Sequence, residues 1–169
     1  MAERLVVVGG DAAGMSAASQ ARRRRGPGDL EIVAFERGHF TSYSACGIPY
    51  FVGEVVTDID TLIARKPEVF REKYAIDARL RTEVTEIDLD RRAVRARAEN
   101  GSESYEGFDQ LVIATGGIPI RPPLEGVDAR GVFGVQTLDH GVAIKAAVED
   151  WKPRRAVVVG GGYIGLEMA

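Results

Sequence analysis

The chain has 169 residues, of which 45% are hydrophobic and 28% charged, and its formal net charge is −3. This is a globular composition, and the acidic balance argues against nucleic acid or an anionic membrane as a partner. One cysteine excludes an internal disulfide framework and fits a reducing compartment, and no apolar run reaches the roughly 20 residues of a membrane span, so we expect a cytoplasmic protein.

The first part of the chain reads as strand, glycine turn, helix and strand. Residues 5–8 and 31–35 are continuous apolar runs typical of buried parallel strands, and residues 12–25 carry helix formers without proline. Glu36 ends the second strand, where an acid accepts hydrogen bonds from a ribose. The pattern therefore predicts a dinucleotide-binding βαβ unit, whose turn consists of Gly9, Gly10, Asp11, Ala12, Ala13 and Gly14.

Asp11 stands where this turn would normally have its second glycine. Its carboxylate would face a diphosphate unless it turns away to cap the helix. At the other end of the same helix, the run Arg22 to Arg25 precedes Gly26-Pro27-Gly28. We interpret these arginines as a solvated helix end, where cations complement the helix dipole.

The only cysteine, Cys46, follows Glu36 by ten residues in the segment Ser42-Tyr43-Ser44-Ala45-Cys46-Gly47-Ile48-Pro49-Tyr50. A cysteine among small residues can lie at the start of a helix, where backbone N–H groups and the helix dipole stabilise a thiolate. The alternative is a small buried hydrophobic residue. The nucleotide-binding pattern beside it favours a redox thiol.

The middle of the chain changes its hydrophobic period. Residues 60–64 and 67–74 are predicted as two short helices. From Arg79 the period becomes two, and the turn at residues 99–102 predicts an antiparallel three-stranded meander with an Asn-Gly hairpin, extending to about Tyr105. Residues 111–114 return to the buried parallel type and are followed at once by Thr115, Gly116 and Gly117.

The opening motif recurs at the end of the chain. After a proline-containing linker and a predicted helix over residues 140–151, residues 156–159 are predicted as a strand leading into Gly160, Gly162 and Gly165. Tyr163 and Ile164 within this motif can be packing residues. Two dinucleotide motifs imply two dinucleotides, one giving a hydride and the other receiving it, with the thiol as a third redox group.

These residues together resemble the pyridine nucleotide-disulfide oxidoreductases, and among them the single-cysteine branch of coenzyme A-disulfide reductases, NADH oxidases and NADH peroxidases. The resemblance implies an α/β fold in which a Rossmann-like FAD-binding parallel sheet carries an antiparallel three-stranded meander and precedes a second dinucleotide-binding fold. It implies that FAD is bound by the first glycine motif together with Glu36, Arg37, Val84, Ala114, Thr115 and Gly116. It also implies that NAD(P)H is bound by Gly160, Gly162, Tyr163, Ile164 and Gly165.

The cysteine segment is similar to the signature of the coenzyme A-disulfide reductases, because the oxidases and peroxidases tend to lack its Pro-Tyr pair. This resemblance implies that Cys46 is the nucleophile, alternating between a thiol and a mixed disulfide with coenzyme A, and that Ser42 orients it. Coenzyme A would be contacted by Ser16, Gln20 and Arg23. Ala45 and Tyr74 depart from the pattern, which commonly has asparagine and lysine at these positions.

The resemblance also predicts the domain organisation. We expect an incomplete FAD-binding domain over residues 1–117, a linker over 118–138 and the start of an NAD(P)H-binding domain over 139–169, within a homodimeric protein two to three times as long. Three hypotheses stay open: a reductase of coenzyme A disulfide or a related persulfide, an NADH oxidase or peroxidase that uses a cysteine sulfenic acid, and a non-catalytic nucleotide-binding fragment. None requires a metal.

Overall fold

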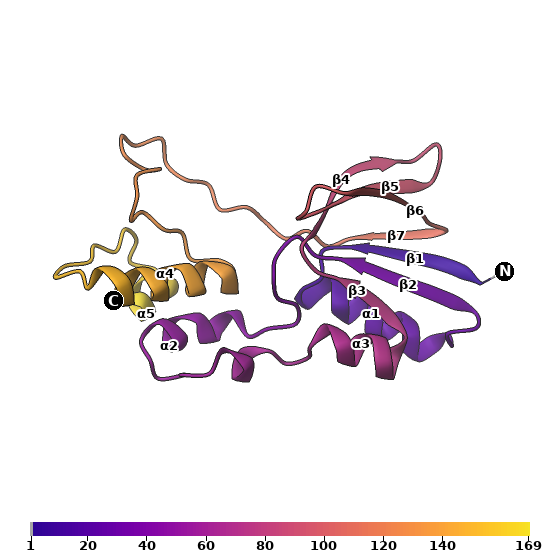
Figure 1. Cartoon of the computed structure of the whole chain (residues 1–169), viewed down its shortest axis with the longest axis horizontal. Helices are drawn as coiled ribbons and strands as arrows, with labels where there is room; N and C mark the ends of the chain where they lie inside the picture. Colours follow the sequence, from indigo (N-terminus) through magenta and orange to yellow (C-terminus); the bar gives the residue numbers. More distant parts are fainter. Residues whose placement is uncertain (1) are drawn as a thin grey trace. The chain divides into compact units, whose positions relative to one another are not determined.

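The computed structural model describes residues 2–169 and divides into two compact units (Figure 1). Unit 1 combines the segment that ends at Tyr43 with Ile63–Gly116, and unit 2 combines Ser44–Leu62 with Gly117–Ala169. The expected FAD-binding domain thus corresponds to unit 1 except for the segment that contains the cysteine. The limits of the functional domains stay a prediction.

A four-stranded parallel sheet with the order β3-β2-β1-β7 forms the centre of unit 1. Its strands β1 (Glu3–Val8), β2 (Leu30–Phe35) and β7 (Gln110–Ile113) correspond to the predicted apolar runs. The edge strand β3 (Ile76–Arg79) is absent from the sequence prediction. It alternates buried apolar with charged residues and is only four residues long, so its pattern merges with that of the following meander.

Both faces of this sheet are covered (Figure 1). On one face, α1 (Ala12–Arg24) and α3 (Pro67–Tyr74) bury a core to which alternate strand residues contribute. That core consists of Leu5, Val7, Met15, Ala18, Leu30, Ile32, Ala34, Phe70, Ile76 and Ala78. The opposite face packs against the meander through Val6, Val8, Val33, Phe35, Val94 and Ala96. Continuous apolar runs therefore occur in β1 and β2 because both of their faces are buried.

The prediction of a solvated arginine run is wrong for Arg22, which is half-buried, whereas Arg23, Arg24 and Arg25 are exposed as expected. Arg22 donates hydrogen bonds at 2.9 Å to the carbonyl oxygens of Tyr74 and Ala75, which satisfies the end of α3. Arg25 pairs with Glu3 at 2.6 Å. Two arginines of the run thus have structural partners in other elements.

The meander consists of β4 (Thr82–Asp88), β5 (Ala93–Ala98) and β6 (Glu103–Gly107) in sequential order, which confirms the prediction. Its second hairpin differs in detail from a two-residue Asn-Gly turn. Gly101 has a φ of 83° and donates its N–H to the carbonyl oxygen of Ala98 at 2.9 Å, and Ala98 donates its own N–H to Ser102. This is the three-residue loop with glycine in the left-handed region.

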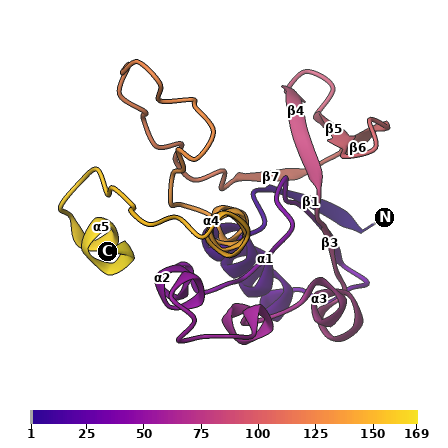
Figure 2. The same cartoon turned by 60° about the vertical axis from the view of Figure 1, so that its left-hand side comes forward.

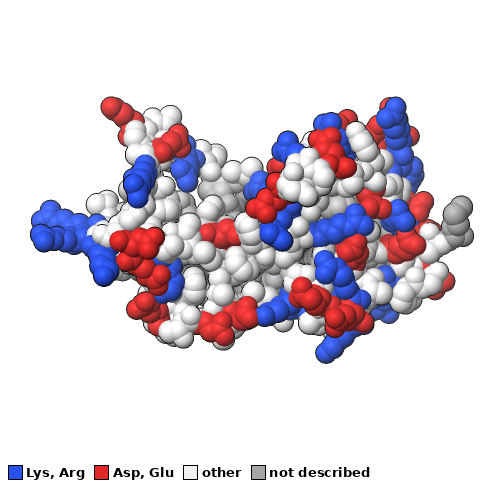
Figure 3. Space-filling view, in the orientation of Figure 1, with Lys and Arg blue, Asp and Glu red and all other residues white. Residues whose placement is uncertain are grey.

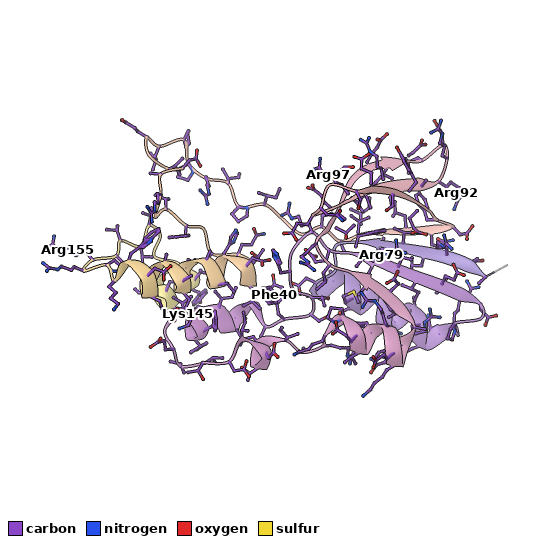
Figure 4. All side chains as sticks on the ribbon, in the orientation of Figure 1. Phe40, Arg79, Arg92, Arg97, Lys145 and Arg155 are labelled. Atoms are coloured by element: carbon purple, nitrogen blue, oxygen red, sulfur yellow. The ribbon has the colours of Figure 1, made fainter. Side chains whose placement is uncertain are left out.

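Ion pairs join the meander to the parallel sheet. The carboxylate of Glu106, on β6, is 14% exposed and lies 2.7 Å from Arg4 on β1 and 2.8 Å from Arg79 on β3. Arg79 projects from the sheet toward the meander (Figure 4). Elsewhere on this unit, acidic and basic side chains are interleaved on the visible face (Figure 3).

Unit 2 is built around two helices that lie side by side, α2 (Ile48–Val52) and α4 (Leu138–Trp151) (Figures 1 and 2). The 3-10 turns η1 (Ala45–Gly47) and η2 (Ile59–Leu62) flank α2, and α5 (Tyr163–Met168) ends the chain described. The predicted helix over residues 60–64 is therefore a 3-10 turn. None of the helices within residues 2–169 combines the length and hydropathy of a membrane-spanning segment.

Residues 156–159 do not form the predicted strand. Val157 and Val159 are 87% and 86% exposed, and no strand among residues 2–169 pairs with them. The pattern is apolar enough for a buried strand, but a strand also requires a neighbour to complete its hydrogen-bond ladder.

Candidate nucleotide site and redox cysteine

The first glycine motif forms a tight turn between β1 and α1. Gly9 has a φ of 105°, and a Cβ there would collide with the carbonyl oxygen of Ala114 at the end of β7. A Cβ on Gly14 would collide with the carbonyl oxygen of Gly9. The structure thus brings Ala114, from the predicted segment 114–116, directly against the glycine turn. Gly116 has a φ of 67° and open space around its Cβ position.

Glu36 lies beside this turn at the carboxyl end of β2. Its Oε2 accepts a hydrogen bond from the N–H of Gly10 at 2.8 Å, and its Oε1 accepts one from the N–H of Gly38 at 2.7 Å. Each carboxylate oxygen can accept two hydrogen bonds, so each retains capacity for a ribose hydroxyl. The predicted acid is therefore fixed next to the predicted phosphate turn, with acceptor sites left over.

Asp11 does not cap α1, although it is the residue at the N-cap position. Burial raises the pKa of its carboxyl group, and the nearby charge of Glu36 adds to this, whereas backbone N–H groups of Tyr43, Ala12 and Ser42 act in the opposite direction. Its Oδ1 is buried and has no hydrogen-bond partner within residues 2–169. The carboxylate thus turns toward the loop after β2, and the first turn of α1 carries no acidic side chain.

These features fit the diphosphate and ribose of a dinucleotide such as FAD. Gly9, Gly10 and Gly14 contribute no side chains to the turn, and the carboxylate of Asp11 is directed toward the loop after β2. Helix α1 presents its N-terminal end without a side-chain cap. The buried Oδ1 of Asp11 is an acceptor without a donor, as expected where a ligand hydroxyl or water completes the site.

The two other predicted FAD residues differ in accessibility. Arg37 lines an open depression of ≈ 320 Å³ together with Arg81, Glu83 and Arg97. The side chain of Val84 packs against the core beneath the meander. Val84 can therefore offer a ligand little besides its backbone.

Ser16, Gln20 and Arg23 lie on one exposed face of α1. The guanidinium of Arg23 is 3.4 Å from the Oε1 of Gln20. Tyr74 does not belong to this face, because its ring packs against the core of unit 1. The guanidinium of Arg65 lies 4.6 Å from the centroid of that ring. The structure thus brings the three predicted coenzyme A residues together without Tyr74.

The loop that leads toward the cysteine is anchored to the glycine turn by a residue that the sequence analysis missed. The hydroxyl of Thr41 donates a hydrogen bond to the carbonyl oxygen of Gly10, and Thr41 is buried. The next residue, Ser42, has a φ of 50°, and its carbonyl oxygen accepts from the N–H of Ala64 at 2.8 Å. In the sequence, the signal for such an anchor is a threonine within a polar loop, because its hydroxyl can hydrogen-bond to backbone groups. The orienting role of Ser42 toward the cysteine stays a prediction, because Ser42 belongs to unit 1 and the cysteine to unit 2.

Cys46 is exposed and lies in η1, which runs directly into α2. Behind it, a Cβ on Gly47 would collide with the side chain of Leu62, and the N–H of Ser44 donates to the carbonyl oxygen of Leu62 at 2.8 Å. The thiol therefore lies at the start of a helix, as the sequence predicts, and it is not a buried hydrophobic residue.

The second glycine motif reproduces the local geometry of the first. Gly160 has a φ of 122°, and a Cβ on Gly165 would collide with the carbonyl oxygen of Gly160 and lie 3.3 Å from Val158. The corresponding distance in the first motif, from Gly14 to Val7, is 3.0 Å. The turn thus forms although its strand is unpaired. Its predicted packing residues, Tyr163 and Ile164, are exposed.

A family model described as pyridine nucleotide-disulphide oxidoreductase matches residues 3–169. The chain is 43% identical to the NAD(P)H coenzyme A polysulfide/persulfide reductase of Pyrococcus horikoshii, over 100% of the chain and 37% of that protein. It is 36% identical to an NADH oxidase of Methanocaldococcus jannaschii, over 98% of the chain and 37% of that protein.

Among solved structures, that of reduced Bacillus anthracis CoADR-RHD is similar, with a TM-score of 0.93 and 33% sequence identity. The match covers 99% of this chain and 30% of that one. The chain spans 37% of the length of each of the two curated relatives, from Pyrococcus horikoshii and Methanocaldococcus jannaschii.

Proposed function

Because the chain belongs to the pyridine nucleotide-disulphide oxidoreductase family, we propose that the whole protein uses NAD(P)H to reduce coenzyme A disulfide or a related persulfide at Cys46. The observation that carries this proposal is the exposed single cysteine at the start of a helix, in a chain with two glycine turns of nucleotide-binding geometry. The name of the Pyrococcus relative, a coenzyme A polysulfide/persulfide reductase, supports the substrate class.

In this proposal, the first glycine motif, Glu36 and the segment 114–116 hold FAD. When bound, FAD would carry two electrons from NAD(P)H to a disulfide. The N-terminal end of α1 favours the negative charge of the diphosphate. The carboxylate of Glu36 offers acceptors to ribose hydroxyls. NAD(P)H would use the second motif once a neighbouring strand completes the sheet around residues 156–159.

Cys46 would act by thiol–disulfide exchange. Its thiolate attacks one sulfur of coenzyme A disulfide, the S–S bond of the substrate breaks, and one coenzyme A leaves as a thiolate while the other stays bonded to Cys46. Two electrons from NAD(P)H then cleave this mixed disulfide, which regenerates the Cys46 thiolate and, with a proton, releases the second coenzyme A thiol. One NAD(P)H thus yields two thiols. The exposed face formed by Ser16, Gln20 and Arg23 would contact coenzyme A, with Arg23 supplying positive charge for its phosphates.

A second candidate is an NADH oxidase or peroxidase, and the similarity to the Methanocaldococcus NADH oxidase favours it. Here peroxide would oxidise the Cys46 thiolate to a sulfenic acid with release of hydroxide, and NAD(P)H would reduce it back to the thiolate. A non-catalytic nucleotide-binding chain is the third possibility. A cytoplasmic location and a homodimer are also part of the leading proposal.

Turnover by the purified full-length protein separates these candidates. We expect anaerobic NAD(P)H oxidation to require coenzyme A disulfide and to fall at least about a thousandfold in Cys46→Ser, because the residual rate lacks the nucleophile. Ser44→Ala is the matched control, since it changes a neighbour two residues away without removing the thiol. Oxidation that needs only oxygen or peroxide would support the oxidase instead, and a colourless protein without flavin would support the non-catalytic chain.

A further inference from the structure

We infer that α4 positions the redox cysteine, with Gly141 and Lys145 as the positioning residues; this inference rests on the proposed role of Cys46. We use the name cysteine helix for the continuous segment Ala45–Val52, which joins η1 and α2. Such a short helix is not stable on its own, so its orientation must come from what it packs against. Two of its apolar side chains, Ile48 and Phe51, are 2% and 7% exposed.

Gly141 provides the close contact between the two helices. A Cβ at Gly141 would lie 2.9 Å from the Cγ2 of Ile48, so either the Ile48 side chain or one of the two helices would have to shift. Gly141 is buried and lies inside α4, where glycine is unfavourable relative to alanine. The close approach of Ile48 gives the physical reason for a glycine at this position.

Lys145, one helical turn later, holds the far end of the cysteine helix. Its Nζ lies 3.1 Å from the Oε1 of Glu54, just beyond α2, and 5.6 Å from the ring centroid of Phe51. Glu149 on α4 pairs with the same Nζ at 2.9 Å. The lysine side chain is 16% exposed and labelled between the two helices in Figure 4. Its ammonium thus joins α4 to the segment that follows the cysteine helix.

The cysteine helix is therefore confined from two directions. Leu62 fills the space against Gly47, immediately after the cysteine, and α4 covers Ile48 and Phe51. Cys46 itself remains exposed. Because the exposed thiol is carried on the cysteine helix, the direction from which it can approach a disulfide follows from how this helix packs. A shift of the helix should lower the rate of disulfide exchange.

The test uses Gly141→Ala and measures the second-order rate of thiol–disulfide exchange with a chromogenic aromatic disulfide and with coenzyme A disulfide. Cys46 is the only cysteine among these 169 residues, so for this chain the rate reports that thiol alone. We expect Gly141→Ala to slow the exchange about tenfold, because the added methyl group displaces the cysteine helix. If Gly141 mattered only for helix propensity, alanine would stabilise α4 and leave the rate unchanged.

A rescue variant and a control sharpen this test. Ile48→Leu removes the Cγ2 methyl group that the new Cβ meets, so the double variant Gly141→Ala/Ile48→Leu should recover the wild-type rate within about twofold. Ala146→Val adds bulk to an exposed position of the same helix and should leave the rate unchanged. Should Gly141→Ala fail to fold, Lys145→Met, which keeps an unbranched apolar stem, is expected to slow the exchange about threefold.

The inference is overturned if Gly141→Ala and Lys145→Met both react at the wild-type rate while thermal unfolding shows them folded. This outcome is distinct from failure of the proposed function, because the exchange rate requires neither FAD nor NAD(P)H. A protein that never turns over coenzyme A disulfide can still show, or fail to show, the dependence of Cys46 reactivity on α4.

Discussion

Replacement of Glu36 by alanine tests how strongly its carboxylate stabilises the glycine turn. Two backbone donors bind it, the N–H groups of Gly10 at 2.8 Å and of Gly38 at 2.7 Å. A hydrogen bond to a charged group contributes about 1.5–3 kcal/mol, and water can partly replace it because the site is only partly buried. We therefore expect Glu36→Ala to lower the free energy of unfolding by about 2–4 kcal/mol, and Glu36→Gln, which keeps one acceptor oxygen, by about half of this.

The assay is urea denaturation followed by far-ultraviolet circular dichroism, in the absence of added FAD so that loss of ligand binding does not contribute. Glu86→Ala is the matched control, because Glu86 forms an exposed ion pair with Arg95 at 3.1 Å. Such surface pairs contribute about 0.2–1 kcal/mol. A loss in Glu36→Ala no larger than in the control would refute the structural role of the carboxylate.

Three further predictions concern charge. Glu106→Gln should lower the free energy of unfolding by about 1–3 kcal/mol in urea denaturation, since it weakens hydrogen bonds to two arginines; an unchanged midpoint would contradict this. Burial raises the folded-state pKa of Asp11, so ionisation costs stability as pH rises through that pKa. Asp11→Asn should therefore have a higher melting temperature than the wild type at neutral pH, and this difference should disappear in acid. An equal or lower melting temperature of the variant at neutral pH would contradict the prediction. Two glutamates raise the pKa of Lys145, so its contribution should persist through neutral pH and disappear only when alkaline pH passes that raised pKa. The difference in melting temperature between Lys145→Met and the wild type, followed from neutral to alkaline pH, measures this contribution. A difference that is already absent at neutral pH would contradict the prediction.

The sequence predicts the elements whose pattern is strong and local. Strands β1 and β2 are buried on both faces, so their apolar runs are continuous, and the glycine turn between β1 and α1 follows from residues that admit no Cβ. The short edge strand β3 escapes prediction because only its alternate residues are apolar. The apolar run at 156–159 gives the opposite error, because it predicts a strand that the structure lacks. An apolar composition does not provide the neighbouring strand that a hydrogen-bond ladder requires.

Side-chain direction is harder to predict than backbone geometry. The pattern locates Glu36 beside the turn, but it does not show that Asp11 turns toward the next loop or that Arg22 caps α3, because both depend on elements far away in the sequence. Thr41 is missed for the same reason, since its acceptor is the carbonyl oxygen of Gly10. The cysteine segment likewise belongs to the same unit as α4, against which it packs at Gly141, a residue distant in the chain.

The most direct test of the proposed function is the mass of the peptide that contains Cys46, taken from the full-length protein after anaerobic reaction with coenzyme A disulfide. We predict that this peptide carries one coenzyme A in disulfide linkage and that stoichiometric NAD(P)H removes it. A peptide that carries only a free thiol, or only added oxygen, after the same reaction would contradict the role of Cys46 as the site of disulfide reduction.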